Sequence, residues 1–244
     1  MGKAKKGTLK SLPSNWQEDM WRTASTPEWK ASRPKLQRAL AILWLLGCRP
    51  AEIALGITIG WANGTLAFEV KGAKLVDAGG RTRGQPTRQV VFSRDSVGAA
   101  ENPAFIFLAD LVQSEGSNEG GIYKLVVTHH ADYLYNCIIA LGKATYPAKR
   151  TRISPYVFRN QFASDLKADP DISLEDAAKL MGHLSDYSIG KYGHAVHGRK
   201  SGKGRVKPTA VRATRQVKHS PKVDRLARFK AASATKRKQQ PKVQ

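Results

Sequence analysis

The sequence predicts an α+β fold that is mainly helical and contains one small antiparallel β-sheet. Apolar residues recur at helical spacing through much of the chain, whereas residues 66–70 alternate between apolar and polar side chains, as a half-buried strand does. Beyond residue 197 the apolar periodicity ends and basic residues dominate. We therefore expect an N-terminal extension (1–25), a folded domain (26–197) and a basic, mostly disordered arm (198–244).

The first predicted elements are helices. The two tryptophans and the methionine of segment 16–21 stand at helical spacing and predict one short helix. The Thr-Pro pair at 26–27 is typical of an N-cap followed by a first helical residue, and the apolar stripe behind it predicts one helix that continues to Gly47. A further short helix is expected over residues 50–55.

Two strands and four more helices follow. Residues 66–71 and 89–92 predict an antiparallel pair of strands, joined by a mobile loop over 72–87 that is rich in Gly and Arg. The rest is expected to be helical, with apolar stripes at residues 105–111, 134–141 and 158–166 and a capping-box sequence that opens a helix over 173–181.

Net charge narrows the class of partner. The formal net charge is +22, and residues 198–244 contain 16 Lys and Arg against one acid, Asp224. Such an excess favours a polyanion, because each cation near a phosphate releases condensed counterions. By itself the charge is compatible with DNA, RNA or an anionic membrane surface, so a general RNA- or nucleoid-associated protein is one reading.

Other features argue against several classes. Cys48 and Cys137 form neither a disulfide framework nor a metal-ligand spacing. The paired histidines near residues 129 and 194 lack acidic or cysteine partners at ligand spacing, so no metal and no cofactor are expected. The basic N-terminus is followed by no apolar segment, and the longest apolar run is about half a membrane span. We expect no membrane association and a cytoplasmic location.

Three separated segments contain residues suited to chemistry at a phosphate, and the first two centre on arginines. Segment 45–53, Leu-Leu-Gly-Cys-Arg-Pro-Ala-Glu-Ile, places Arg49 after an apolar helix, with Glu52 three residues later. Segment 153–163, Ile-Ser-Pro-Tyr-Val-Phe-Arg-Asn-Gln-Phe-Ala, centres on Arg159. Planar guanidinium groups stay charged and donate paired hydrogen bonds, so both arginines could bind non-bridging phosphate oxygens.

The third segment, 180–194, begins with Leu-Met-Gly-His. It places Tyr192 ten residues after Gly182, with His194 two residues later. In order and spacing the three segments resemble the catalytic boxes of tyrosine recombinases, the family of phage integrases. The resemblance spans residues 36–197. It implies the catalytic-domain fold of that family and a Tyr192 that attacks DNA to form a 3′-phosphotyrosyl ester, which a free hydroxyl later reverses without ATP.

The resemblance also assigns roles to the surrounding residues. Arg49 and Arg159 would clamp the phosphate, and His183 would donate a further hydrogen bond to it. In this family a lysine on a β-hairpin protonates the departing 5′ oxygen. The run Val-Lys-Gly-Ala-Lys is similar to that hairpin turn, which makes Lys71 the first choice and Lys74 the second.

The second segment departs from the family pattern. Tyr156 stands where the family usually has His, and Asn160 stands where a second His usually follows the arginine. Tyr156 can donate a hydrogen bond to a phosphate oxygen, but it cannot shuttle protons near neutral pH as imidazole does. Glu52 matches the acid of the first box and is expected to orient its neighbours, and His194 is expected beside the nucleophile.

The resemblance implies double-stranded DNA as the partner, bound by a dimer or tetramer, and a gene carried by a mobile element such as a phage. The basic arm is expected to add phosphate contacts through Arg199, Lys200, Lys203, Arg205 and Lys207. Alternatively, part of this arm could pack on a neighbouring protomer.

Two other functions fit the same residues. One is a type IB topoisomerase-like strand relaxer, which resembles the family in its catalytic groups. The other is a non-catalytic DNA-binding relic of a recombinase. Tyr156 favours this relic, as does the short segment before the first catalytic helix, which cannot form the family's separate DNA-clamping domain.

Overall fold

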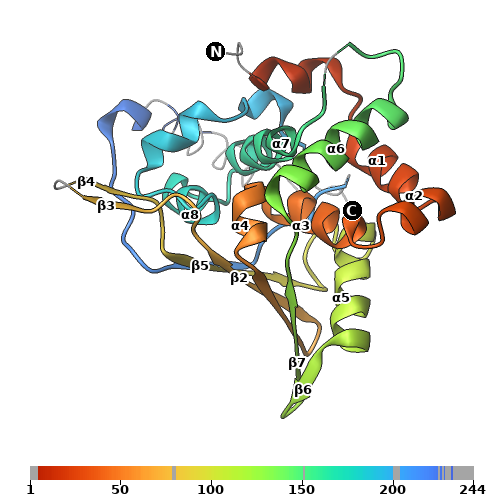
Figure 1. Cartoon of the computed structure of the whole chain (residues 1–244). Coiled ribbons are helices and arrows are strands. Elements are labelled where there is room, and N and C mark those ends of the chain that lie inside the picture. Colours follow the sequence, from red (N-terminus) through yellow and green to blue (C-terminus); the bar gives the residue numbers. More distant parts are fainter. Residues whose placement is uncertain are drawn as a thin grey trace, which may run out of the picture.

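A six-stranded antiparallel sheet and the helices around it make up the fold; in Figure 1 most helices lie above the sheet and α5 runs alongside it. The predicted α+β class, mainly helical with an antiparallel sheet, is confirmed. The computed structural model describes residues 5–78, 81–150, 152–199 and 204–224, together with residues 226, 228 and 232.

Each predicted helical segment is helical, with one correction given below. The α-helices are α1 (Trp16–Ala24), α2 (Pro27–Ser32), α3 (Leu36–Leu46), α4 (Pro50–Ala54), α5 (Pro103–Glu115), α6 (Ala131–Thr145), α7 (Pro155–Ala168) and α8 (Leu174–Leu180). Short 3-10 helices are η1 (Lys5–Ser11), η2 (Asp186–Lys191), η3 (Ala195–His197) and η4 (Pro221–Val223). No helix in the described part of the chain is both long and apolar enough to span a membrane.

The segment predicted as one helix up to Gly47 is two helices, α2 and α3. Helix α2 ends at Ser32, and Arg33 leaves helical geometry with φ −144° and ψ 65°. Pro34 explains the break, because its ring disfavours the helical region for the residue before it and it has no N–H to donate.

The sheet has the strand order β6-β7-β1-β2-β5-β8. Its strands are β1 (Ile57–Ala62), β2 (Thr65–Lys71), β5 (Thr87–Ser93), β6 (Ser117–Glu119), β7 (Ile122–Val127) and β8 (Ala210–Ala213); a separate hairpin pairs β3 (Val76–Ala78) with β4 (Arg81–Arg83). Strands β2 and β5 pair antiparallel, with Phe68 opposite Val90, which confirms the predicted pair.

Two strand regions differ from the sequence-based expectation. The expectation that only helices follow residue 100 is wrong for the β6–β7 hairpin. The apolar residues Ile122 and Val126 of β7 are exposed, so the strand has no apolar-in, polar-out alternation to mark it. The loop predicted over residues 72–87 contains the β3–β4 hairpin.

The N-terminal residues are part of the core. The Trp16 ring packs edge-on against Phe158 of α7 with 4.6 Å between centroids, and its indole N–H donates to Gln161 Oε1 at 3.2 Å. Trp21 packs against Trp44. Segment 1–25, expected as an extension, therefore contributes two aromatic anchors to the main hydrophobic core in its described part.

Residues 204–224 also pack on the folded domain, where the sequence predicts a mostly disordered arm. Strand β8 pairs with β5, and the indole N–H of Trp44 donates to the Gly204 carbonyl at 2.7 Å. The guanidinium of Arg205 forms a buried ion pair with Asp169 at 2.7 Å. Acids of the folded domain thus neutralise basic residues of the tail, which local charge counting could not reveal.

We expect Arg205→Ala to destabilise the protein by about 3 kcal/mol, because it leaves the Asp169 carboxylate buried with a weakened partner set. Urea denaturation measures this change in the free energy of unfolding. The matched control is Arg212→Ala on the exposed face of β8, for which we expect a change within about 0.5 kcal/mol. Equal, small effects of both changes would contradict a stabilising role for the tail.

Candidate active site

The first wall of the site is the turn between α3 and α4. Gly47 ends α3 in the left-handed conformation, at φ +56°, and a Cβ there would come within 2.7 Å of the Phe162 Cβ. Only glycine satisfies both conditions. The chain then turns so that Arg49 caps α4, with its backbone N–H donating to Glu52 Oε2 at 2.9 Å and its Nη1 donating to Oε1 at 2.6 Å.

Glu52 is fully buried and forms a second ion pair, with Arg88 of β5 at 3.0 Å. Burial raises the pKa of Glu52, but the charges of Arg88, Arg159 and Arg49 outweigh it and hold the pKa well below its usual range. The Glu52 carboxylate is therefore ionised at neutral pH. Glu52 lies beside Arg49, and the orienting role expected from the sequence stays a prediction.

Arg88 is a site residue that the sequence-based prediction missed. Its side chain is 1% exposed, its Nη2 lies 3.5 Å from Cys48 Sγ, and a Cβ on Gly182 would come within 2.8 Å of its Nη1. Alternation along β5 could have found it, because Arg88 shares the inward face with Val90 and Phe92. Burial raises the pKa of the Cys48 thiol to about 12, so this sulfur stays protonated.

Arg159 of α7 joins the three motif segments. Its guanidinium is fully buried, and its Nη1 donates to the Gly47 carbonyl at 2.9 Å. Its Nη2 donates to the Met181 carbonyl at 2.6 Å and lies 3.2 Å from His183 Nε2. One side chain thus fixes the end of α3 relative to the end of α8.

The end of α8 positions His183. Gly182 has φ +68°, its N–H donates to the Lys179 carbonyl at 2.9 Å, and the His183 N–H donates to the Ala178 carbonyl at 2.8 Å. These two hydrogen bonds together form a Schellman motif. The cap reverses the chain and leaves the Met181 carbonyl to accept from Arg159.

The His183 imidazole is neutral in this site. Burial lowers its pKa well below the usual range, and the charges of Arg159 and Arg49 lower it further. Because a guanidinium only donates, Nε2 accepts from Arg159 and Nδ1 carries the proton. Within the described part of the chain, the buried His183 Nδ1 and Arg159 Nε have no hydrogen-bond partner. Buried donors of this kind suit a ligand with acceptor oxygens.

Tyr192 lies directly after η2, with its ring stacked on His183 at a centroid distance of 5.3 Å. The Arg159 Cζ lies 4.9 Å from the centre of the Tyr192 ring. Burial raises the pKa of Tyr192, but the charges of Arg159 and Arg49 lower it below the usual 10. The positive charges of the site therefore make the phenol easier to ionise.

Lys167 holds the backbone around Tyr192. Its buried ammonium donates to the Tyr192 carbonyl at 2.6 Å, to the Ile189 carbonyl at 3.2 Å and to the Gly193 carbonyl. The structure also brings Asn160 to this point, where its Oδ1 accepts from the Gly193 N–H at 3.4 Å. Asn160 thus holds the backbone of Gly193, the residue that follows Tyr192.

The other predicted residues lie around this cluster or apart from it. Tyr156 is partly buried on the first turn of α7, one turn before Arg159. Lys71 is exposed at the end of β2 and Lys74 is exposed just before β3. Among the described side chains, no hydrogen bond or ion pair joins either lysine to Tyr192. His194 is exposed, with its ring 6.2 Å from that of His197.

The residues expected to bind DNA from the arm are placed differently. Arg199 pairs with the buried Asp165 at 2.8 Å, and Arg205 pairs with Asp169, so neither guanidinium is available to a phosphate in this arrangement. Lys207 pairs with Asp171 at 2.8 Å and remains about one-third exposed. The remaining two expected contacts, Lys200 and Lys203, lie outside the described residues.

The tail also contacts the turn that precedes η2. Lys218 donates its N–H to the Leu184 carbonyl at 2.7 Å, and His219 Nδ1 lies 2.7 Å from Asp186 Oδ2. Gln85 bridges the two segments, since its Nε2 donates to the carbonyls of His183 and Arg215. The backbone between His183 and η2 is thus held by the C-terminal segment.

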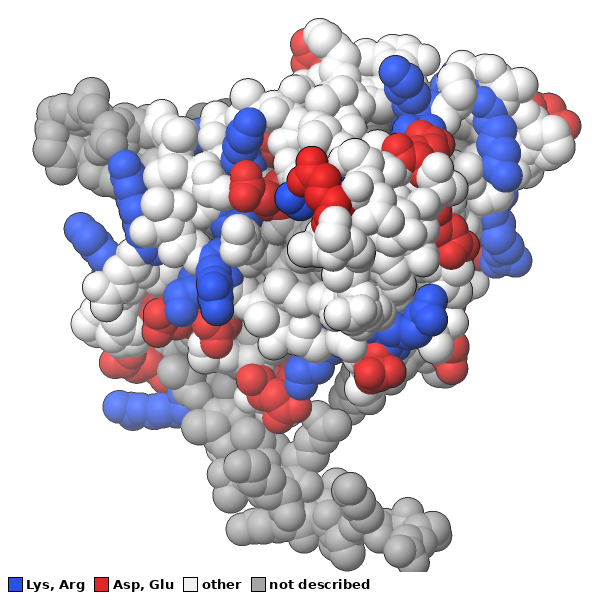
Figure 2. All heavy atoms as spheres, turned by 90° about the horizontal axis from the view of Figure 1, so that it is seen from below, with Lys and Arg blue, Asp and Glu red and all other residues white. Residues whose placement is uncertain are grey.

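Charge on the surface is not uniform. On the face shown in Figure 2, Lys and Arg side chains are interspersed with Asp and Glu. A face of this kind is a poor match for the regular negative charge of a duplex. In the described part of the chain, no group of three or more His, Cys, Asp or Glu side chains could hold a metal ion.

The fold and these groups define a site that could bind an anion beside a phenol whose pKa is lowered. No protein-family model matches the chain, and no curated protein matches it in sequence. Among solved structures the chain is similar to the crystal structure of XerA recombinase, at 15% sequence identity and a TM-score of 0.45. The similarity covers 74% of this chain and 58% of the XerA chain, so this chain spans less than two thirds of that recombinase.

Glu52→Gln should destabilise the protein most at neutral pH, by about 3 kcal/mol, because the change leaves two buried arginines without their carboxylate. The pKa of Glu52 is lowered on folding from about 4.5, so its ionised form stabilises the fold above that pH, and this contribution is lost as the pH falls through the lowered value. The difference in unfolding free energy between wild type and variant should therefore shrink below about pH 4.5.

Chemical denaturation from pH 7 down to pH 3 measures this difference. The control is Glu119→Gln, whose side chain is 76% exposed and should show a small difference at every pH. A wild-type to Glu52→Gln difference that stays constant with pH would rule out the ionised, arginine-paired Glu52.

Proposed function

We propose that this protein is a DNA strand transferase of the tyrosine-recombinase type, which cuts and rejoins DNA through a covalent bond between Tyr192 and a 3′ phosphate. The observation that carries the proposal is the position of the Tyr192 ring, which stacks on His183 and lies 4.9 Å from the Arg159 Cζ. Burial raises the pKa of the Tyr192 hydroxyl, but the charges of Arg159 and Arg49 bring it below its usual value. A phenol with a usual pKa near 10 needs such activation to act as a nucleophile near neutral pH.

In the proposed reaction the Tyr192 phenolate oxygen attacks phosphorus, the bond from phosphorus to the 5′ oxygen breaks, and a 3′-phosphotyrosyl ester forms. Negative charge grows on the non-bridging oxygens as this happens. Arg49, Arg159 and the unpaired Nδ1–H of His183 are the donors suited to that charge. Attack by a free 5′ hydroxyl then reverses the step and releases the phenol, so no external energy source is needed.

The departing 5′ oxygen requires a proton. By the family resemblance Lys71 supplies it, with Lys74 as the alternative, and Tyr156 donates a hydrogen bond to the phosphate in place of the usual His. The proposal includes exchange of strands between specific sites by a dimer or tetramer on double-stranded DNA. It needs no bound cofactor for the transesterification itself.

The decisive experiment uses a nicked suicide substrate that carries the DNA flanking the gene, and measures a protein–DNA adduct that survives SDS. We expect an adduct with the wild type, none with Tyr192→Phe, and a loss of roughly 100-fold or more with Arg49→Ala or Arg159→Ala. Tyr187→Phe, in the short helix η2 that directly precedes Tyr192 and 45% exposed, is the matched control and should retain the adduct.

Other outcomes identify the alternatives. Wild-type protein that binds this DNA tightly and never forms the adduct would support the non-catalytic relic. Adducts on arbitrary sequence, together with relaxation of supercoiled plasmid, would support the topoisomerase-like function.

The pH dependence of cleavage should report the Tyr192 pKa. Burial raises that pKa, but the charges of Arg159 and Arg49 lower it by more. The single-turnover rate should therefore rise with pH and level off below pH 10. In Arg49→Gln the midpoint should move to higher pH, since one of the lowering charges is gone. A substrate with sulfur as the 5′ leaving atom needs no proton donor. With this substrate the pH dependence reports the phenol alone, without a contribution from Lys71 or Lys74. An unchanged midpoint in the variant would contradict activation by Arg49.

A further inference from the structure

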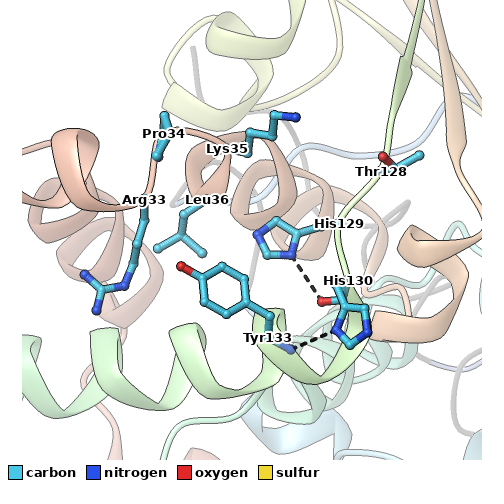
Figure 3. A pocket seen from close by; sticks show the side chains of 8 residues that line it. All are labelled: Arg33, Pro34, Lys35, Leu36, Thr128, His129, His130 and Tyr133. Atoms are coloured by element: carbon cyan, nitrogen blue, oxygen red, sulfur yellow. Dashed lines mark hydrogen bonds between the residues drawn. The ribbon is translucent and has the colours of Figure 1, made fainter.

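A second concave site lies at the start of α3, away from Tyr192. Its volume is about 330 Å³, and its polar lining comes from Arg33, Lys35, Thr128, His129, His130 and Tyr133. Figure 3 shows these side chains gathered from two places in the chain, the break between α2 and α3 and the junction of β7 with α6. No carboxylate lines it.

The charges at this point are unfavourable for the protein alone. Lys35 is the N-cap of α3 and Arg33 lies two residues before it, yet no acidic residue stands in the first turn of that helix. The N-terminus of a helix carries a partial positive charge, so cations are the wrong sign there. Helix α6 begins at the same cavity, with His130 as its N-cap, and its first turn already contains Asp132. An anion in the cavity would therefore offset mainly the unfavourable positive charge at the start of α3.

His129 supplies a donor or acceptor that the fold does not use. The side chain is 9% exposed, and its Nδ1 lies 3.2 Å from the His130 carbonyl. Among the described residues its Nε2 makes no hydrogen bond, although the ring lines the cavity. The ring stacks on Tyr133 at a centroid distance of 5.5 Å, which fixes its orientation.

The Tyr133 ring forms a wall of the cavity. Cys137, one helical turn further along α6, raises the pKa of the Tyr133 hydroxyl. The charge of Arg33 acts on the same phenol from the other side. In Figure 3 the ring lies between Arg33 and the two histidines. The cationic and imidazole groups therefore border one space rather than separate surfaces.

We propose that this cavity binds a phosphate group through Arg33, Lys35 and the imidazole of His129. Phosphate suits two cations, two helix N-termini and neutral or protonated imidazoles better than a carboxylate does, because it offers more acceptor oxygens. The phosphate belongs either to the DNA backbone or to a small phosphorylated molecule. The first source rests on the proposed function. Helix α3, of 11 residues, is about 16 Å long, with the cavity at its start and Gly47, two residues before Arg49, just past its end.

The first test does not involve DNA. Inorganic phosphate is titrated into the full chain and the backbone amides of His129, His130 and Tyr133 are followed by NMR. We expect saturable shifts in the wild type and affinity about tenfold weaker in Arg33→Gln/Lys35→Gln. The matched control is Lys30→Gln/Lys143→Gln, which removes two exposed charges from α2 and α6 outside the cavity and should leave the affinity unchanged. Equal affinities in all three proteins, or no saturable shift, would overturn the site.

The second test separates the two sources. If the phosphate belongs to DNA, the slope of log affinity against log salt should fall by about 1 to 2 in the cavity variant, one for each lost phosphate contact, and by less in the control. A cavity variant that loses phosphate but keeps the wild-type salt slope would assign the site to a small phosphorylated molecule and overturn the DNA source. Tyr192→Phe should leave both measurements unchanged, so failure of the strand-transfer chemistry would not affect this result.

Discussion

The buried carboxylate of Glu52 is the group on which the geometry of the site depends. Arg49 and Arg88 pair with it at 2.6 Å and 3.0 Å, and the charge of Arg159 also acts on it. Guanidinium groups this close repel one another strongly where water is excluded. One carboxylate that accepts from two of them allows their assembly and restricts Arg49 to a single arrangement. Removing it would leave the cations buried without compensation, the costly case for any buried pair.

Compensation by Glu52 is incomplete, and this excess of positive charge is what suits the site to an anion. Three arginines face one carboxylate, so neighbouring groups respond. The pKa of His183 falls well below its usual range through burial and these charges, and that of Tyr192 falls despite its burial. Two buried donors, His183 Nδ1 and Arg159 Nε, also have no partner among the described residues. A bound phosphate would satisfy both kinds of deficit, because it brings charge and acceptor oxygens together.

The motif residues of the site could be predicted because their signals are local. Gly47 and Gly182 each end a helix in a left-handed conformation, and each places the arginine or histidine that follows it. Arg88 belongs to the same network, but predicting it requires knowing which face of β5 points inward. The predicted strand also began one residue later, at Gln89. The helices were likewise predictable from apolar stripes, apart from the break at Pro34.

The parts of the fold that could not be predicted depend on contacts distant in sequence. Strand β7 has exposed apolar residues, so only its pairing with β1 and β6 identifies it. The tail lacks the apolar periodicity from which its position could have been predicted. That position is set by the ion pair of Arg205 with Asp169 and by the pairing of β8 with β5. Neither signal exists in a local window of sequence.

The same tail changes how the positive charge of this chain is interpreted. A basic C-terminal run suggests loose contacts with phosphates, yet in residues 204–224 it is partly consumed by acids of the folded domain. The tail also holds the start of η2, through the Lys218 backbone with Leu184 and the His219 side chain with Asp186. Because Tyr192 follows η2 directly, the contacts that the tail makes with η2 help to fix the position of the phenol. Residues 204–224 are therefore better regarded as a support of the candidate site. Contacts with phosphate are better sought on cations that have no acidic partner among the described residues, such as Arg33 and Lys35 at the start of α3.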